Sequence, residues 1–145
     1  MRSERGRLPQ ALVDVLLARG IERSELHGCR PDEIERVRVA QRVDALPSVY
    51  VEFLTVMGRG ARAFLPGTDV FYPHPIELKT EARALLSENG VADFLGDSEV
   101  VVSMHQGYQF AWMTVGDPRV GLYSEGYEGV RHSWSDLPAF LLATG

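Results

Sequence analysis

The chain has 145 residues, a length typical of one globular domain. A hydrophobic content of 45% and a charged content of 24% exclude global disorder. No apolar run approaches the roughly 20 residues that a membrane-spanning helix requires, and the net charge is −5.

Acidic residues are concentrated in the second half of the chain. Residues 1–80 carry eleven acids and twelve basic residues, whereas residues 81–145 carry nine acids and three arginines. An acid-rich surface repels phosphate backbones and attracts basic partners, although a solvated surface that only aids solubility explains the pattern equally well. No basic residue lies between Arg83 and Arg119, so the aromatic residues of this segment lack the charge of an RNA-binding sheet. We therefore expect a protein partner, and neither nucleic acid nor a membrane.

The predicted elements begin with an amphipathic helix over residues 9–19, closed by Gly20. Basic residues ahead of an apolar stretch are typical of a secretion signal, but Asp14 interrupts this stretch and no small-residue cleavage site follows. We therefore expect a cytoplasmic protein. Residues 1–30 are interpreted as an N-terminal helical extension, and residues 31–145 as the main domain.

Three further helices are predicted in the first two thirds of the chain. Pro31 with two acids behind it begins the first. The second begins at Pro47, carries apolar residues at helical spacing and ends at Gly58. The third covers residues 77–88, with Asn89-Gly90 as its stop signal.

Short strands dominate the remainder of the chain. The pattern predicts strands over residues 68–72 and, from residue 100 onward, in the segments VVVSMH, YQFAWMTV, VGLYSE and GVRHSW. A closing helix is predicted with Ser135 as its N-cap. Because no helix fits between the later strands, we predict an α+β fold, a single domain with a mainly antiparallel sheet flanked by helices.

The segment MHQGYQF, residues 104–110, is the stretch that most resembles a catalytic cluster. A hairpin with Gln106-Gly107 at its tip would pair His105 with Tyr108, near the end of the sheet. The same register makes two further pairs, Ser103 with Phe110 and Val101 with Trp112.

His105 has two interpretations. In the structural one, its ring packs against Tyr108. As a general base it needs an acidic orienter and a nucleophile, and Ser103 has no oxyanion-hole signature around it and no G-x-S-x-G motif. We therefore predict no catalytic residue, with a hydrolase that uses His105 as a minor alternative.

Metal and cofactor sites are not expected. His27 and Cys29 supply two potential ligands without a second pair at suitable spacing. The glycines after the helix that ends at Gly58 lack the strand, helix and Lys-Ser/Thr of a phosphate cradle. Asp117-Pro118 is a turn signal, so Asp117 is interpreted as a turn former. The other potential metal ligands are His74, His105 and His132, which are scattered along the sequence. The other glycines of the segment that follows the helix are Gly60 and Gly67.

Segments in a defined order resemble the SUKH superfamily. They are LPSVYVEFLTVMGRG, VVVSMHQGYQFAWMTVGDPRVGLYSEG and WSDLPAFLL, and the resemblance covers roughly residues 31–145. Family members carry a Leu-Pro that opens a helix ending in Gly, an HQGYQF-type hairpin, a Pro-Val-x-x-Tyr strand and a Trp-Ser-x-Phe-Leu helix. Here Arg119 interrupts the third of these patterns. The matching residues are Leu46-Pro47, Tyr50, Phe53-Leu54, Gly58, His105 to Phe110, Trp134, Phe140 and Leu141.

The resemblance implies an α+β domain without known catalytic activity. Bacterial members act largely as immunity proteins that bind and block toxin domains, often nucleases or deaminases. Other members serve as intracellular interaction scaffolds. We therefore expect a non-enzymatic immunity protein, with an interaction scaffold as the alternative.

Candidate partner-binding residues are the acids in predicted turns and strand ends of the acid-rich half, with tyrosines as anchors. They are Asp97, Glu99, Tyr108, Asp117, Glu125, Tyr127 and Glu128.

Overall fold

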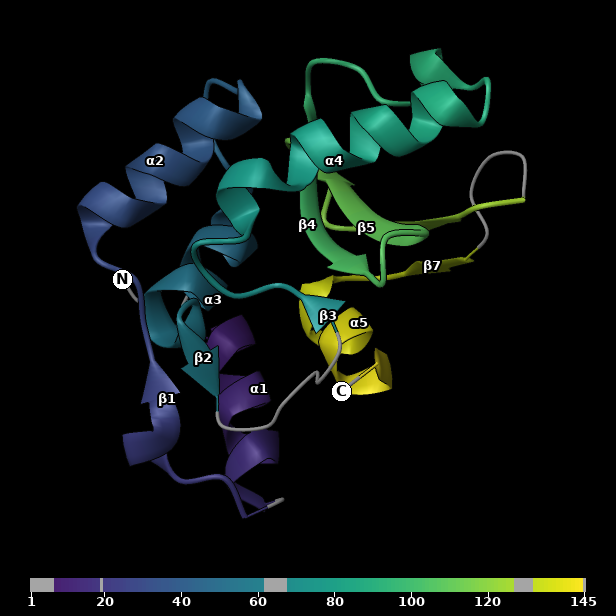
Figure 1. Cartoon of the computed structure of the whole chain (residues 1–145). Coiled ribbons are helices and arrows are strands. Elements are labelled where there is room, and N and C mark those ends of the chain that lie inside the picture. The colour runs from purple at the N-terminus through teal and green to yellow at the C-terminus, as the bar shows by residue number, and fades with distance from the viewer. Residues whose placement is uncertain (1–6, 19, 62–67, 127–131, 145) are drawn as a thin grey trace.

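Figure 1 shows the computed structural model, which describes residues 7–18, 20–61, 68–126 and 132–144. Its helices are α1 (Arg7–Ala18), α2 (Pro31–Gln41), α3 (Ser48–Met57), α4 (Pro75–Glu88) and α5 (Leu137–Thr144). Its strands are β1 (Leu26–His27), β2 (Gly60–Ala61), β3 (Thr68–Asp69), β4 (Glu99–His105), β5 (Gln109–Thr114), β6 (Val120–Ser124) and β7 (His132–Trp134). The predicted α+β fold is confirmed.

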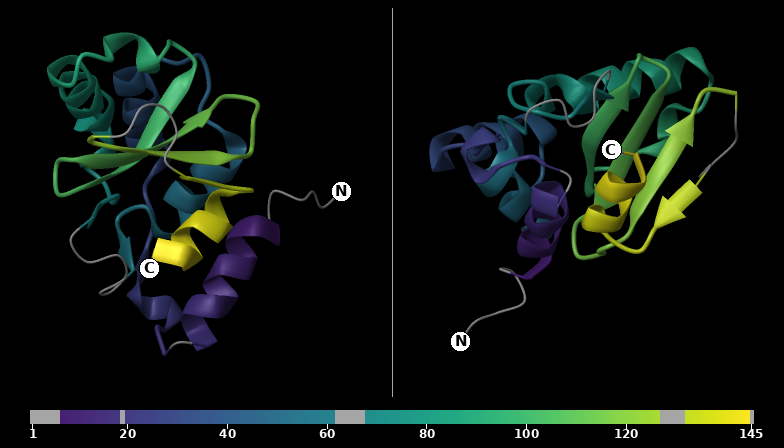
Figure 2. Two further views of the ribbon diagram at one scale, coloured as in Figure 1. Left: turned by 90° about the vertical axis from the view of Figure 1, so that its right-hand side faces the viewer. Right: turned by 90° about the horizontal axis from the view of Figure 1, so that it is seen from below.

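The larger sheet is antiparallel throughout and lies between two helical layers. Its strand order is β3-β4-β5-β6-β7, while β1 and β2 form a separate two-stranded sheet. Helix α4 covers one face of the larger sheet and α5 lies against the other (Figures 1 and 2). Two apolar cores result. Between α4 and the sheet lie Leu78, Leu86, Met104, Phe110 and Tyr123, and on the opposite side lie Leu16, Tyr50, Leu54, Met113 and Leu141.

The helix predictions are confirmed, with small differences at the ends. Pro31 is the first residue of α2, and Pro47 immediately precedes α3. Helix α4 begins at Pro75, earlier than predicted. The predicted N-cap of α5, Ser135, is wrong by one residue, because Oδ1 of Asp136 accepts the backbone N–H of Ala139 at 2.9 Å.

Residues 7–30 share the core of the rest of the chain. Helix α1 packs against α3 and α5, and its Leu16 is fully buried in the common core. Residues 26–27, which fall within the predicted helical extension, form β1 and pair with β2. The N–H of Cys29 then donates to the carbonyl of Leu54 at 2.8 Å. These contacts attach the segment to α3.

The predicted register of the β4–β5 hairpin is wrong near its tip. His105 pairs with Gln109 instead of Tyr108, and Ser103 pairs with Ala111 instead of Phe110. A bulge between Val101 and Ser103 shifts the register by one residue, so that the predicted partnership of Val101 with Trp112 is correct. The tip itself has positive φ at both Gln106 and Gly107, which a type I′ turn requires.

The side chain of Gln41 completes the hydrogen bonding of β4. Strand β3 pairs with Met104 and His105, so among the described residues no strand lies beside the outer edge of β4 at Val101. There the Gln41 carboxamide accepts the Val101 N–H at 3.0 Å and donates to the Val101 carbonyl at 2.8 Å. It also donates to the Pro75 carbonyl at 3.0 Å. One buried amide thereby connects α2, α4 and the sheet.

Lys79 lies beside this amide. Its ammonium group donates to the backbone carbonyl of Gln41 at 2.7 Å, and the side chain is only 3% exposed. Burial lowers the pKa of Lys79 below its ordinary value. The carbonyl that it binds belongs to the last residue of α2, where a positive charge complements the helix dipole.

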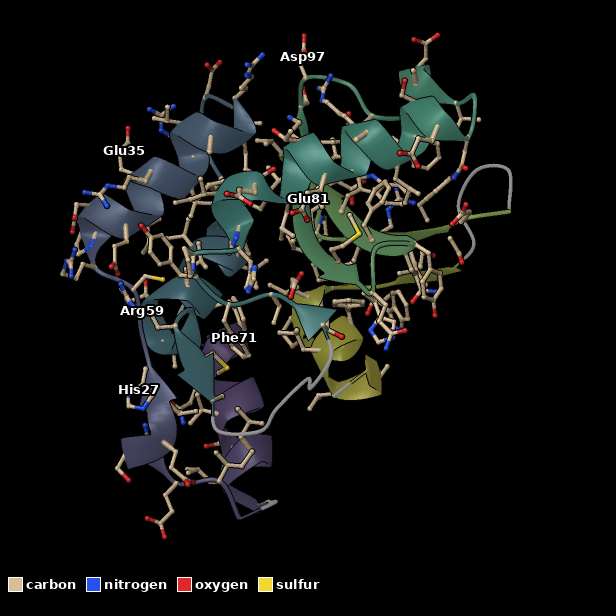
Figure 3. The ribbon with its side chains drawn as sticks, in the orientation of Figure 1. His27, Glu35, Arg59, Phe71, Glu81 and Asp97 are labelled. Atoms are coloured by element: carbon tan, nitrogen blue, oxygen red, sulfur yellow. The ribbon has the colours of Figure 1, made fainter. Side chains whose placement is uncertain are left out.

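A buried carboxylate attaches α2 to the end of α3. Glu33 is 1% exposed, and its Oε1 accepts a hydrogen bond from Nε of Arg59 at 3.0 Å. The N–H of Arg30 donates to the same oxygen at 2.9 Å. These hydrogen bonds, that of Arg59 first, lower the pKa of Glu33 to about 2. The Arg59 guanidinium also lies 5.1 Å from the ring centre of Tyr72, and Figure 3 shows Arg59 below the start of α2.

Candidate functional site

The turn between β5 and β6 stands between two surface grooves. We call residues 115–118 the turn ridge. Successive residues of β5 point to opposite faces of the sheet, so Trp112 lines the groove on the α4 side and Met113 the groove on the α5 side. Asp117 lines both grooves. We call them the sheet-face groove and the helix-side groove.

The sheet-face groove has a volume of about 320 Å³ and lies on the sheet face that α4 covers, where Trp112 lies over β6. Phe94, in the turn after α4, packs edge-on against Trp112 with ring centres 5.0 Å apart. The indole lies over Gly121, where an added Cβ would be only 2.5 Å from Cη2 of Trp112. Glycine is therefore required at this position for the ring to lie flat on β6. The groove is lined by Trp112, Thr114, Asp117, Arg119, Val120, Gly121 and Ser133.

Asp117 and Arg119 form an ion pair at the end of this groove. Nη2 of Arg119 is 2.7 Å from Oδ2 of Asp117, and the Arg119 backbone N–H also donates to Asp117 at 3.0 Å. The side-chain and backbone hydrogen bonds from Arg119 lower the pKa of Asp117 to about 2. Asp117 is thus a turn former, as predicted, and its charge is matched by Arg119, the residue that follows the ridge.

The helix-side groove, of about 350 Å³, has a mainly apolar wall. One side comes from the start of α3 and the other from the turn ridge, segments that are more than 60 residues apart in the sequence. Val115 contributes to it and is one of the few large apolar side chains exposed among the described residues, at 37%. The groove is lined by Leu46, Pro47, Ser48, Val49, Met113, Val115, Gly116, Asp117, Pro118 and Asp136.

Two of the predicted partner-binding acids lie at the same end of the sheet as the ridge. Glu99, the first residue of β4, pairs with Thr114 across the sheet, and its Oε2 accepts a hydrogen bond from the Thr114 hydroxyl at 3.2 Å. Asp97 is fully exposed in the preceding loop, with Oδ1 3.8 Å from Nη2 of Arg83 (Figure 3). Asp97, Glu99 and Asp117 therefore share one end of the sheet.

Two other predicted residues, Tyr108 and Glu125, are not brought to this end. Tyr108 lies at the tip of the β4–β5 hairpin, at the opposite end of β4, and its carbonyl accepts the N–H of Glu125 at 2.9 Å. Tyr127 and Glu128 lie outside the described residues. The five predicted residues that the structure describes hence do not form one patch.

The rejected catalytic residues have structural contacts. The His105 ring packs against Tyr108 with ring centres 5.9 Å apart, the contact that the structural interpretation expects, and its Nδ1 lies 2.9 Å from the Thr68 hydroxyl oxygen. Ser103 is buried at 4% exposure. In the described part of the chain, no three His, Cys, Asp or Glu side chains gather closely enough to hold a metal ion. Nε2 of His74 lies 3.7 Å from Oδ1 of Asp69.

Within the described ranges, no helix is long and apolar enough to cross a membrane. Comparison of the sequence with protein-family models gives no match, and comparison with curated proteins gives none either. The site is therefore defined by its geometry: a turn ridge with an apolar groove on one side and an aromatic-floored groove on the other.

The sequence alone did not single out Trp112, Val115 or Arg119 as site residues. Trp112 and Val115 fall in the predicted strand YQFAWMTV, and Arg119 follows the turn signal Asp117-Pro118. The signal that would have found them is the alternation along β5, which places Trp112 and Met113 on opposite faces just before the turn.

Proposed function

We propose that this protein is a cytoplasmic, non-enzymatic immunity protein that binds a toxin domain, a nuclease or a deaminase, and blocks it. The observation that carries the proposal is the pair of grooves beside the turn ridge, within the acid-rich half of the chain. Protein interfaces are anchored by a few side chains in pockets, with a polar rim around them. The two grooves offer such pockets on either side of one protruding turn.

The resemblance to the SUKH superfamily supports the same proposal. Leu46-Pro47, which matches the first family element, precedes α3 and lines the helix-side groove. The closing family segment contains Asp136, which lines the groove from the other side. The elements that carry the resemblance thus border the proposed binding surface.

Charge supports a basic partner. A nuclease must bind phosphates and is therefore rich in basic residues. The acid-rich half would accelerate its association and would discriminate against acidic proteins. At the end of the sheet that holds the ridge, Glu99 and Asp136 contribute this charge, in addition to the ion-paired Asp97 and Asp117.

Co-expression tests the proposal. If the neighbouring gene encodes an exported protein that ends in a small toxic domain, that domain should kill cells when expressed alone and spare them when this protein is present. Failure to rescue would overturn the immunity role and favour the alternative, an intracellular interaction scaffold without a toxin.

Two exposed valines provide a matched pair of variants. Val115→Glu places a charge at the mouth of the helix-side groove, whereas Val39→Glu places one on α2, where Val39 is 58% exposed. We expect Val115→Glu to abolish rescue and Val39→Glu to preserve it. Equal rescue by both variants would exclude the turn ridge as the binding surface.

The predicted acids need a separate test, because they do not form one patch. We expect Asp97→Asn and Glu99→Gln to weaken toxin binding and to reduce its dependence on ionic strength. Unchanged affinity and salt dependence would show that the acids act only as a solvated surface.

A further inference from the structure

The sheet-face groove has an aromatic part and a polar part. Trp112 and Gly121 pair across β5 and β6, and the indole lies over the glycine, so the wall of the first part is aromatic. Nearer the turn, Thr114, two residues after Trp112, and Arg119, two residues before Gly121, line the same groove. Ser133, the partner of Gly121 in β7, lines it as well. An occupant must therefore match an aromatic surface at one end and polar groups at the other.

The charges that line this groove cancel. Among the described residues, the charged side chains that line it are Asp117 and Arg119, and Nη2 of Arg119 is 2.7 Å from Oδ2 of Asp117. Nε of Arg119 and its backbone N–H also donate to the same carboxylate. A charged occupant would compete with one member of this pair for the other. The groove therefore suits a group without net charge.

The polar end offers a hydrogen-bond donor and an acceptor. Nη1 of Arg119 makes no hydrogen bond with any described residue, and this side chain is 73% exposed, so Nη1 can donate to an occupant. The Thr114 hydroxyl donates to Oε2 of Glu99 at 3.2 Å. Because its single proton is used in that bond, its oxygen can act only as an acceptor toward the groove. A hydroxyl group matches both, since it donates and accepts through one atom, whereas a carboxylate only accepts and an ammonium only donates.

We propose that the sheet-face groove binds a tyrosine side chain of the partner protein. This inference rests on the proposed function and names the anchoring residue of the partner. The tyrosine ring packs against Trp112, and its hydroxyl donates to Thr114 and accepts from Arg119. Two residues along a strand span about 6.6 Å, which is about the length of a tyrosine side chain. Tyrosine is uncharged at neutral pH and is one of the residue types that most often anchor protein interfaces.

Three capped peptides test the inference on the full chain: acetyl-Gly-Tyr-Gly-amide, acetyl-Gly-Phe-Gly-amide and acetyl-Gly-Ser-Gly-amide. The first carries an aromatic ring and a hydroxyl, and each of the others carries one of the two. NMR of the indole N–H signals reports binding, because the chain has two tryptophans and Trp112 lines this groove. Trp134 packs on Phe140 in the core on the opposite side of the sheet and is the internal control.

We expect the tyrosine peptide to shift the Trp112 signal saturably. The phenylalanine peptide should bind about three- to tenfold more weakly, and the serine peptide should leave the signal unmoved. Thr114→Val keeps the shape of the side chain and removes the acceptor, so it should lower the affinity of the tyrosine peptide to that of the phenylalanine peptide. Thr55→Val is the matched control and should keep the preference for tyrosine, since the Thr55 hydroxyl is exposed on α3 and donates to the carbonyl of Val51.

Four results would overturn the inference. They are equal binding of the tyrosine and phenylalanine peptides, an equal shift by the serine peptide, an unmoved Trp112 signal, and an unchanged preference for tyrosine in Thr114→Val. An unaltered Trp134 signal verifies that this variant is folded. The three peptides are compared on the unsubstituted chain, so that comparison decides the matter even if the variant does not fold.

The outcome is separable from that of the proposed function. Rescue in co-expression without a preference for the tyrosine peptide would leave the immunity role and reject this groove chemistry. A preference for the tyrosine peptide without rescue would support the groove chemistry and reject the immunity role.

Discussion

The Gln41 carboxamide should be among the most sensitive side chains of the fold. The variant Gln41→Met nearly preserves side-chain volume and helix propensity but removes every hydrogen bond that the amide makes. It leaves the N–H and carbonyl of Val101 without their partner, and it removes one hydrogen bond from the carbonyl of Pro75, which as the first residue of α4 still accepts an N–H within the helix. The Val101 groups are buried between α2, α4 and β4, where water cannot replace the lost partner without local opening.

The expected loss follows from the two groups of Val101. A buried polar group without its partner costs about 1–3 kcal/mol, and carbonyls tolerate the loss better than N–H groups. Taking the lower value for each group gives a decrease of about 2 kcal/mol in the free energy of unfolding. For a chain of this size, such a decrease lowers the melting temperature by about 4–8 °C.

Urea unfolding followed by tryptophan fluorescence measures this loss. Gln10→Met is the matched control, since Gln10 is exposed on α1 and donates only to Asp14, and it should change stability by less than about 0.5 kcal/mol. A loss below about 1 kcal/mol for Gln41→Met would refute the view that this side chain completes the β4 ladder.

Three further changes test other parts of the structure. Gly121→Ala should displace the Trp112 ring and destabilise the fold by about 1–3 kcal/mol, measured by the urea midpoint and tryptophan emission; an unchanged midpoint would contradict the close contact at Gly121. Glu33→Gln should lower the urea midpoint at pH 7, because a group with a depressed pKa stabilises the fold at every pH above its ordinary pKa, here 4.5. The difference in urea midpoint from the unsubstituted chain should shrink as the pH falls toward 2. A difference that is constant with pH would contradict this. Burial raises the pKa of the Cys29 thiol to about 11, so at pH 8 Ellman's reagent should modify it only as fast as the chain opens; immediate modification would show that the thiol is accessible.

The sequence predicts the elements well because their signals are local. Pro31 and Pro47 mark the starts of helices, and hydrophobic spacing of 3.6 residues follows each of them. The strands of the acid-rich half are separated by turns that contain Gly107 and Gly116, both with positive φ. Each of these features is set by residues within a few positions of one another.

The register of the hairpin was predicted wrongly for a physical reason. Both faces of β4 are apolar, so a shift of one residue does not expose a hydrophobic face and leaves no sign in the pattern. The bulge between Val101 and Ser103 then absorbs the extra residue. The N-cap of α5 is a similar case, because Ser135 and Asp136 are adjacent and both are good capping residues.

The binding surface could not be predicted because it has no local pattern. The helix-side groove joins residues 46–49 to residues 113–118, and only the packing of α3 against the sheet brings them together. The role of Gln41 is equally non-local, since its partner Val101 lies 60 residues further along the chain. Predictions based on turns and strand ends found Asp117 but missed the grooves that it borders.

The burial of Lys79 has a chemical consequence for the whole surface. It is the only lysine in the sequence, so the folded domain presents no ε-amino group to acylating reagents or to enzymes that conjugate lysine side chains. The amine becomes reactive only when α2 separates from α4 and releases the Gln41 carbonyl. Acylation of Lys79, followed by mass spectrometry, would therefore time the opening of the seam between these helices in the native protein.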